Sequence, residues 1–197
     1  HAHADTLSFE LSLGKERVFV NSGTSEYGLG EFRQNQRKTK SHNTVEIDEK
    51  DSSQVWGGFR VANRARIIRK HYEMDSGNRI LFVGEHDGYK KTFGGCIHSR
   101  SLNIGNNSLT VNDTISGKFK TATSYFYFHP DLHIHLEQNI LNVNGSGFSM
   151  YSDLKGLKYL LSDSTYHPEF GITKKNKVLS INFTDSDVKV SFIWAPC

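Results

Sequence analysis

The sequence has few of the residues that indicate a disulfide scaffold, a cysteine-based metal centre or a membrane protein. Two cysteines occur in 197 residues, Cys96 and the final Cys197, and neither has the spacing of a zinc or redox motif. No apolar run approaches the roughly 20 residues of a membrane-spanning helix. We therefore expect both cysteines to be structurally incidental and expect no membrane span.

A strong excess of charge of either sign is also lacking. Lys and Arg number 24 against 21 Asp and Glu, which gives a net charge of +3 at pH 7. This small, scattered excess is compatible with an acidic ligand and is too weak to indicate nucleic-acid binding. Charge alone therefore leaves the function open, and we expect no nucleic-acid partner.

Helical patterning is the third feature that the sequence lacks. No segment has apolar residues at helical spacing over three turns, so we expect little helix. Short alternating segments recur instead, separated by turn formers such as DSGN, NGSG and TDSD, and SLNIGNNSLTV is the clearest hairpin. The pattern predicts an all-β fold, an antiparallel multi-stranded β-sandwich of stacked sheets, in a single domain over residues 1–197. The expected strands are RVFVNSG, NTVEID, RARIIRKHYEM, RILFVGEH, CIHSRSLNI, SLTVNDTIS, TSYFYFHP, LHIHLEQNILNVN, KVLSINFT and DVKVSFIWAP.

The first stretch, HAHADTLSFELSL, places polar residues on an alternating pattern that then becomes apolar. In an extended strand, His1, His3 and Asp5 share one face with the apolar row that runs from Leu7 to Leu13. Imidazoles on a core-facing side require hydrogen bonds, a metal or an active-site cleft. The residues leave these three explanations open. Because the chain begins inside this expected strand and without methionine, we expect a fragment or processed piece.

One segment, residues 23–43, is polar, basic and rich in glycine, and we expect it to be a long loop. Long loops in compact domains tend to be functional. Its four cationic side chains indicate a site for a polyanion, and the alternative is a solvated surface loop. These side chains are Arg33, Arg37, Lys38 and Lys40.

Several motifs in order, HAHADTLSFEL, RVFVNSGTSEYG, RQNQRKTKSHNTVEID and later YFYFHP and YHPEFGI, resemble the C-terminal domain of the heparinase II/III-like polysaccharide lyases. The resemblance spans nearly the whole chain. It implies a β-sandwich that follows an N-terminal α/α toroid, which is expected upstream and is absent from this chain. It also implies β-elimination in uronic-acid-containing acidic polysaccharides, in a periplasmic or secreted bacterial setting.

Carried over by position, the resemblance gives His1 a catalytic role and makes His3 and His42 metal ligands. The third ligand in the family is usually an aspartate, and Asn21 stands at that position. Zinc is the expected metal and calcium the alternative, although a neutral amide lacks the charge that a carboxylate brings. Two possibilities stay open: Asp5 supplies the charge, or His3, Asn21 and His42 form a metal-free hydrogen-bonded cluster.

Three further residues of the basic segment, Tyr27, Arg33 and Arg37, are expected to bind substrate, the arginines by bidentate bonds to carboxylates or sulfates. A turn anchor and ordinary loop solubility are the alternatives. The second H-x-H, at His133 and His135, is expected to face solvent because apolar residues alternate with it.

The expected function is the sandwich part of an acidic-polysaccharide lyase that is inactive as an isolated domain. One alternative is a non-catalytic domain that binds acidic glycans or has a structural role. A third hypothesis is a self-standing metalloenzyme that uses His1, His3 and His42. Trp56 and the aromatic residues 125–128 are expected in the core rather than on a sugar-binding surface.

Overall fold

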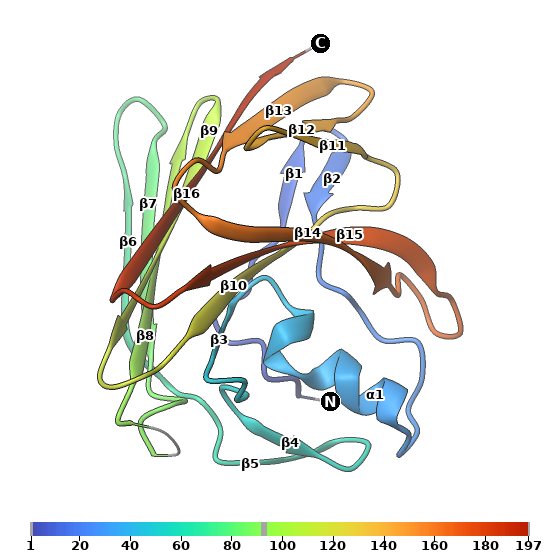
Figure 1. Cartoon of the computed structure of the whole chain (residues 1–197), viewed down its shortest axis with the longest axis vertical. Helices are drawn as coiled ribbons and strands as arrows, with labels where there is room; N and C mark the ends of the chain where they lie inside the picture. Colours follow the sequence, from blue (N-terminus) through green and yellow to red (C-terminus); the bar gives the residue numbers. More distant parts are fainter. Residues whose placement is uncertain (1, 92–93, 197) are drawn as a thin grey trace.

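The computed structural model describes residues 2–91 and 94–196, so the catalytic prediction at His1 and the cysteine at position 197 lie outside the described residues. Antiparallel strands dominate the structure, and the predicted all-β sandwich is confirmed (Figure 1). The longest α-helix that the structure describes has seven residues, far too few to cross a bilayer.

Two sheets enclose the core of the described chain. The larger has eight strands in the order β11 (His133–Glu137), β12 (Ile140–Asn144), β13 (Phe148–Asp153), β16 (Asp187–Pro196), β9 (Ser108–Ser116), β8 (Ile97–Gly105), β7 (Ile80–His86) and β6 (Ile67–Met74). The smaller has four strands in the order β14 (Lys158–Tyr166), β15 (Lys174–Phe183), β10 (Ala122–Tyr127) and β3 (Val45–Ile47).

Two short hairpins complete the strands of the described chain: β1 (Leu11–Leu13) with β2 (Glu16–Phe19), and β4 (Gln54–Trp56) with β5 (Arg60–Ala62). The helix α1 (Glu31–Arg37) and a 3-10 turn, η1 (Thr39–Ser41), lie at the end of the molecule where β4 and β5 lie, close to the N-terminus (Figure 1).

Buried aromatic rings join the two sheets. Phe19 of β2 packs against Phe126 of β10 and Phe192 of β16, with ring centroids 5.8 Å and 4.8 Å apart. Such ring pairs add about 0.5–1.5 kcal/mol each beyond the area they bury. Phe126 and Phe128 are in this core as expected, whereas Trp56 is 50% exposed and the expectation that it is buried was wrong.

The clearest predicted hairpin, β8 and β9, is present, with Gly105 opposite Ser108. Strands β4, β5, β13 and β14 are missing from the predicted set. The sequences of β13 and β14, FSMYSD and KYLLSDSTY, carry several serines and aspartates that weaken the strand signal. Pairing with β12, β16 and β15 supplies the strand conformation instead.

The expectation of one continuous strand at the start of the chain was wrong for the described residues 2–10. The strand begins only at Leu11, and Leu7 has a left-handed φ of 63°. A turn in which the Ser8 N–H donates to the Asp5 carbonyl, at 2.9 Å, breaks the alternation. Bonds from residues 37–52 hold this irregular segment, including Ala4 N–H to the Arg37 carbonyl and the Thr44 hydroxyl to the Thr6 carbonyl.

The expectation of a structureless loop over residues 23–43 was also wrong, because α1 and η1 occupy its second half. The helix has seven residues, so it is too short to show an apolar period over three turns. Its buried face is polar, made of Arg33, Gln36 and Arg37. A helix that buries guanidinium and amide groups gives no hydrophobic signal in the sequence.

Candidate functional site

The helix α1 places two arginines on one buried face. Arg33 and Arg37 are four residues apart, which is one helical turn, and both are 0% exposed. No carboxylate among the described residues forms an ion pair with either guanidinium. Two cations are therefore held inside the fold by neutral acceptors alone. Burying an unpaired charge lowers stability, so such an arrangement indicates either a further partner or a functional role.

Arg37 uses every N–H group that it has on backbone carbonyls. Its Nε and Nη2 donate to the Ala2 carbonyl, Nη1 donates to the Trp56 and Gly57 carbonyls, and Nη2 also donates to the Arg60 carbonyl. This guanidinium fastens the N-terminal segment to the β4–β5 hairpin. With its donors so engaged, it offers none to a substrate in this conformation.

Arg33 is bonded less completely. Its Nε donates to the Gly58 carbonyl at 3.2 Å, and its Nη1 donates to His3 Nε2 and to the Thr24 hydroxyl, each at 3.0 Å. Its Nη2 is buried and has no hydrogen-bond partner among the described residues. Tyr27, 60% exposed, covers the guanidinium with its ring centroid 5.5 Å away.

The structure brings His3, Asn21 and His42 together, as the resemblance implied. The rings of His3 and His42 lie 5.1 Å apart, and His42 Nδ1 lies 3.1 Å from Asn21 Oδ1. Because that oxygen also accepts the Gly23 N–H, it is the amide oxygen that faces His42, and the proton of the ring is on Nδ1. His42 Nε2 therefore carries a lone pair and no proton, and it is buried without a hydrogen-bond partner among the described residues.

Both imidazoles are held neutral. Burial, followed by the charges of Arg33 and Arg37, lowers the pKa of His3 to about 4. Burial and the neighbouring His3 lower the pKa of His42 to about 3. We call this group, His3, Asn21, Arg33, Arg37 and His42, the α1 cluster.

The donor set of the α1 cluster fits a zinc ion poorly. His42 Nε2 is a suitable ligand atom, and both rings are neutral as metal binding requires. His3 Nε2, however, accepts a hydrogen bond from a guanidinium, and the amide oxygen of Asn21 orients His42. Asp5 is exposed, and no bond joins it to either histidine in the described chain, so no carboxylate balances the charge.

A second buried polar group, which sequence reasoning missed, fixes the position of this site. Asp113 accepts bonds from His98 Nε2 at 2.9 Å and from Arg100 Nε at 2.7 Å, and His98 Nδ1 lies 3.0 Å from His86 Nε2. Arg100 Nη1 also donates to the carbonyls of Leu7 and Asn43, next to His42. We call His86, His98, Arg100, Asp113 and Ser124 the Asp113 network.

The sequence did contain a signal for this network. The IGNNS turn sets Gly105 opposite Ser108, and that register places Arg100 directly opposite Asp113. Both side chains share the inward face with Leu102 and Val111. A charged pair in register on a core-facing side indicates a buried ion pair.

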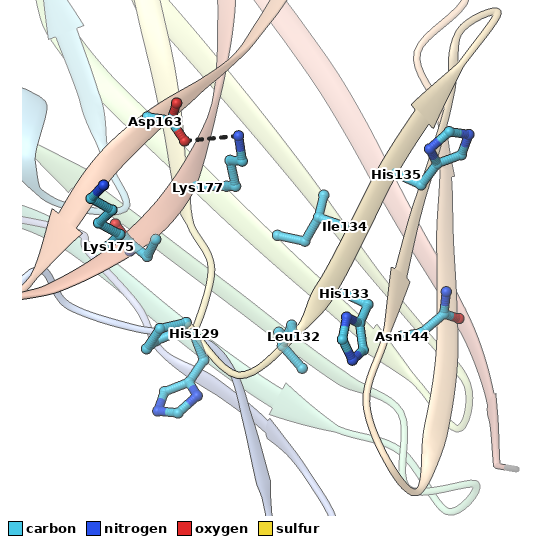
Figure 2. A pocket seen from close by; sticks show the side chains of 11 residues that line it. His129, Leu132, His133, Ile134, His135, Asn144, Asp163, Lys175 and Lys177 are labelled. Carbon is cyan, nitrogen blue, oxygen red and sulfur yellow. Dashed lines mark ion pairs between the residues drawn. The ribbon is translucent and has the colours of Figure 1, made fainter.

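A separate hollow of about 380 Å³ lies between β11 and the strands β14 and β15, and Figure 2 shows its lining. Ile134 points from β11 toward Lys177, which pairs with Asp163 at 2.8 Å, whereas His135 points to the other side of the strand (Figure 2). His133 and His135 are exposed as predicted, and they do not converge with the lysines on a common point.

Comparisons with known proteins agree with the motifs. The family model for the C-terminal part of heparinase II/III-like proteins matches residues 1–195. No curated protein matches. Among solved structures, heparinase III, the BT4657 gene product, is 19% identical with a TM-score of 0.74, and the heparan sulfate lyase HepC from Pedobacter heparinus is 16% identical with a TM-score of 0.77. Each match covers 100% of this chain and 31% of the solved chain. The chain thus spans about a third of the length of these proteins, and it belongs to the heparinase II/III-like family as its C-terminal domain.

Proposed function

We propose that this domain forms one wall of the cleft of a lyase that cleaves uronic-acid-containing polysaccharides by β-elimination. An upstream α/α toroid completes the cleft, and the domain alone is inactive. The observation that carries the proposal is the pair of fully buried arginines beside His3 with no carboxylate partner in the described chain. The family match and the threefold greater length of the solved relatives support it.

The chemistry of β-elimination explains why such charges are useful. Removal of the proton at C5 of a uronic acid builds negative charge next to an existing carboxylate, so the reaction needs fixed positive charge or donors near that oxygen. Arg33 and Arg37 are buried, so solvent screens their field weakly. In this proposal, His1 takes part in proton transfer or carboxylate neutralisation, Tyr27 faces the substrate, and Arg33 acts through its charge from beneath the Tyr27 ring.

The test compares this chain with a longer polypeptide that contains it. Formation of unsaturated uronate, followed by ultraviolet absorbance with heparan sulfate and alginate as substrates, is expected only from the longer protein. Arg33→Met is expected to lower kcat/KM at least tenfold there, because it removes a positive charge worth about 1.5–3 kcal/mol to an anion. Product release by the 197-residue chain, or full activity of the variant, contradicts the proposal.

A non-catalytic glycan-binding domain is the second candidate, and Asn21 is the observation that favours it. Where the family has an aspartate, this chain has an amide that orients His42. If the longer polypeptide binds acidic polysaccharide but forms no product, the glycan-binding function is supported.

A periplasmic or secreted location is part of the proposal only because such polymers lie outside the cytoplasm.

For the α1 cluster itself, we propose the metal-free, hydrogen-bonded form over the zinc or calcium site. Plasma mass spectrometry of the purified protein tests this, with His3→Ala and His42→Ala beside it. Less than a tenth of an equivalent of metal is expected in all three. Asn21→Asp is the matched variant, and because it adds the missing charge, it is expected to raise zinc affinity about tenfold or more. Stoichiometric zinc in the parent, lost in both alanine variants, overturns the metal-free form.

A further inference from the structure

One stretch of the chain has cations without acids. Residues 52–72 contain no Asp or Glu, although the whole chain carries 21 of them. The same stretch contains five cations, at positions 60, 64, 66, 69 and 70. The modest net charge of the protein therefore hides a strongly basic segment, which runs through the β4–β5 hairpin into the edge strand β6.

The segment presents its cations and two large aromatic side chains to solvent. Trp56 is 50% exposed and Phe59 is 63% exposed, at the tip of the β4–β5 hairpin. The Arg60 guanidinium lies 4.7 Å from the centroid of the Trp56 ring. An exposed indole beside a guanidinium offers an apolar flat surface and a fixed positive charge at one point.

A hollow of about 350 Å³ follows directly along the chain. Its lining includes Arg64, Arg66 and Lys91, and Asp87 is the one acid among the lining residues that the structure describes. The Asp87 carboxylate accepts the backbone N–H of Arg66 at 2.8 Å, so it shapes the turn. No ion pair within the described residues engages the side chains of Arg64, Arg66 or Lys91.

The helix of the α1 cluster holds this surface in place. Arg37 binds the Trp56 and Gly57 carbonyls, Arg33 binds the Gly58 carbonyl, and Gln34 Nε2 also donates to the Gly57 carbonyl. Figure 1 shows β4 and β5 beneath α1, at the end of the molecule near the N-terminus. The basic surface therefore adjoins the proposed cleft and is positioned by the same buried arginines.

We propose that Trp56, Arg60, Arg64, Arg66 and Lys91 form a binding surface for an acidic polysaccharide, outside the cleft. The apolar face of one sugar ring stacks on Trp56, and the carboxylate or sulfate groups of that sugar and its neighbours pair with the arginines and Lys91. Charge complementarity favours a polyanionic glycan over a protein partner, because the surface combines an exposed aromatic ring with three cations that form no ion pair in the described chain. The proposal takes its ligand class from the proposed function.

The test measures affinity for a heparan sulfate octasaccharide by calorimetry, with no cleavage required. Arg64→Ala/Arg66→Ala is expected to weaken binding about tenfold or more, since it removes two exposed positive charges that pair with the polyanion. Trp56→Leu, which keeps the charge and the backbone carbonyl, is expected to weaken it severalfold. Lys174→Ala/Lys175→Ala removes the same charge from exposed positions on β15 and is expected to change binding less than twofold.

The outcomes separate this proposal from the lyase proposal. An equal loss of affinity in the two double variants would show that the octasaccharide is attracted to charge without a specific site. Absence of measurable binding by the parent protein would show that this glycan is not a ligand. Either result overturns the proposed binding surface. An unchanged affinity for Trp56→Leu overturns the stacking site. If the variants lose binding as expected but the longer polypeptide forms no product, the surface stands and the lyase proposal falls. Circular dichroism of each variant excludes unfolding as the cause.

Discussion

The α1 cluster and the Asp113 network are both buried and polar, but they differ in how completely they are satisfied. In the Asp113 network a carboxylate accepts bonds from a histidine, an arginine and the Ser124 hydroxyl. In the α1 cluster two arginines have only neutral acceptors, and Arg33 Nη2 and His42 Nε2 have no partner in the described chain. In a structural network every buried donor and acceptor is expected to have a hydrogen-bond partner. Buried donors and acceptors without one indicate a site that binds a further group.

Asp113→Asn is expected to have the largest effect on stability. It leaves the buried Arg100 without its counter-charge and replaces one accepting oxygen by an NH2 donor, at a cost of about 3–5 kcal/mol in the free energy of unfolding. Urea unfolding measures it. The control is Asp163→Asn, which breaks an exposed pair with Lys177 and is expected to cost less than about 1 kcal/mol. Equal effects of the two variants would show that the Asp113 network is not a structural ion pair.

The two arginines of α1 give a sharper comparison within one helix. Arg37→Met leaves four backbone carbonyls without their donor and is expected to destabilise the fold by about 2–4 kcal/mol. Arg33→Met also removes a buried, incompletely bonded charge, so its cost is expected to stay below about 1 kcal/mol. Thermal and urea unfolding of both variants decide the order, and a larger loss for Arg33→Met would assign Arg33 a mainly structural role.

Acid is expected to act on the α1 cluster through its histidines. The pKa of His42 is about 3 in the fold and about 6.5 in the unfolded chain, so below pH 6.5 the unfolded state binds the extra proton. The stability that neutral His42 contributes is complete above about pH 6.5 and declines toward pH 3 by up to about 1.4 kcal/mol per pH unit. In urea titrations from pH 7 to pH 4, His42→Gln is expected to flatten this slope by one proton, and an unchanged slope contradicts the neutral assignment.

The smallest expected effect tests the hydrogen bond that orients His42. Asn21→Ala removes one acceptor and is expected to cost about 1 kcal/mol, and it frees the ring to exchange tautomers. Nitrogen chemical shifts of the imidazole report the tautomer directly. Asn21→Asp keeps the acceptor and adds a charge, so it is expected to keep the proton on Nδ1 and to raise the pKa of His42. A fixed tautomer in Asn21→Ala would mean that packing alone orients the ring.

Much of the fold could be predicted from the sequence, because period-two alternation and turn chemistry are local signals. The β8–β9 hairpin follows from the IGNNS turn, and the exposed His133 and His135 follow from alternation with Ile134 and Leu136. Strands β13 and β14 were missed because their serines and aspartates obscure the pattern, and partner strands decide such segments.

The composition of the candidate site was predictable, but its geometry was not. His3, Asn21 and His42 were grouped correctly by the family resemblance. The segment around His3 was expected to be a strand and is irregular. Arg33 and Arg37 were expected to bind substrate from a long loop, and they are buried in a helix. Their burial depends on carbonyls of the β4–β5 hairpin and of Ala2, which lie far along the chain from the helix.

Local patterns in the sequence suffice to predict an antiparallel β-sandwich of the heparinase II/III-like family, and its ordered motifs group His3, Asn21 and His42. These conclusions rest on alternation, turn formers and ordered motifs, which are properties of the chain read locally. Three-dimensional packing is needed to establish that Asn21 orients His42, that two arginines are buried without a carboxylate partner in the described chain, and that Trp56 is exposed beside Arg60. Burial, pKa and hydrogen-bond partners depend on segments that are distant in the sequence, and packing alone brings those segments together.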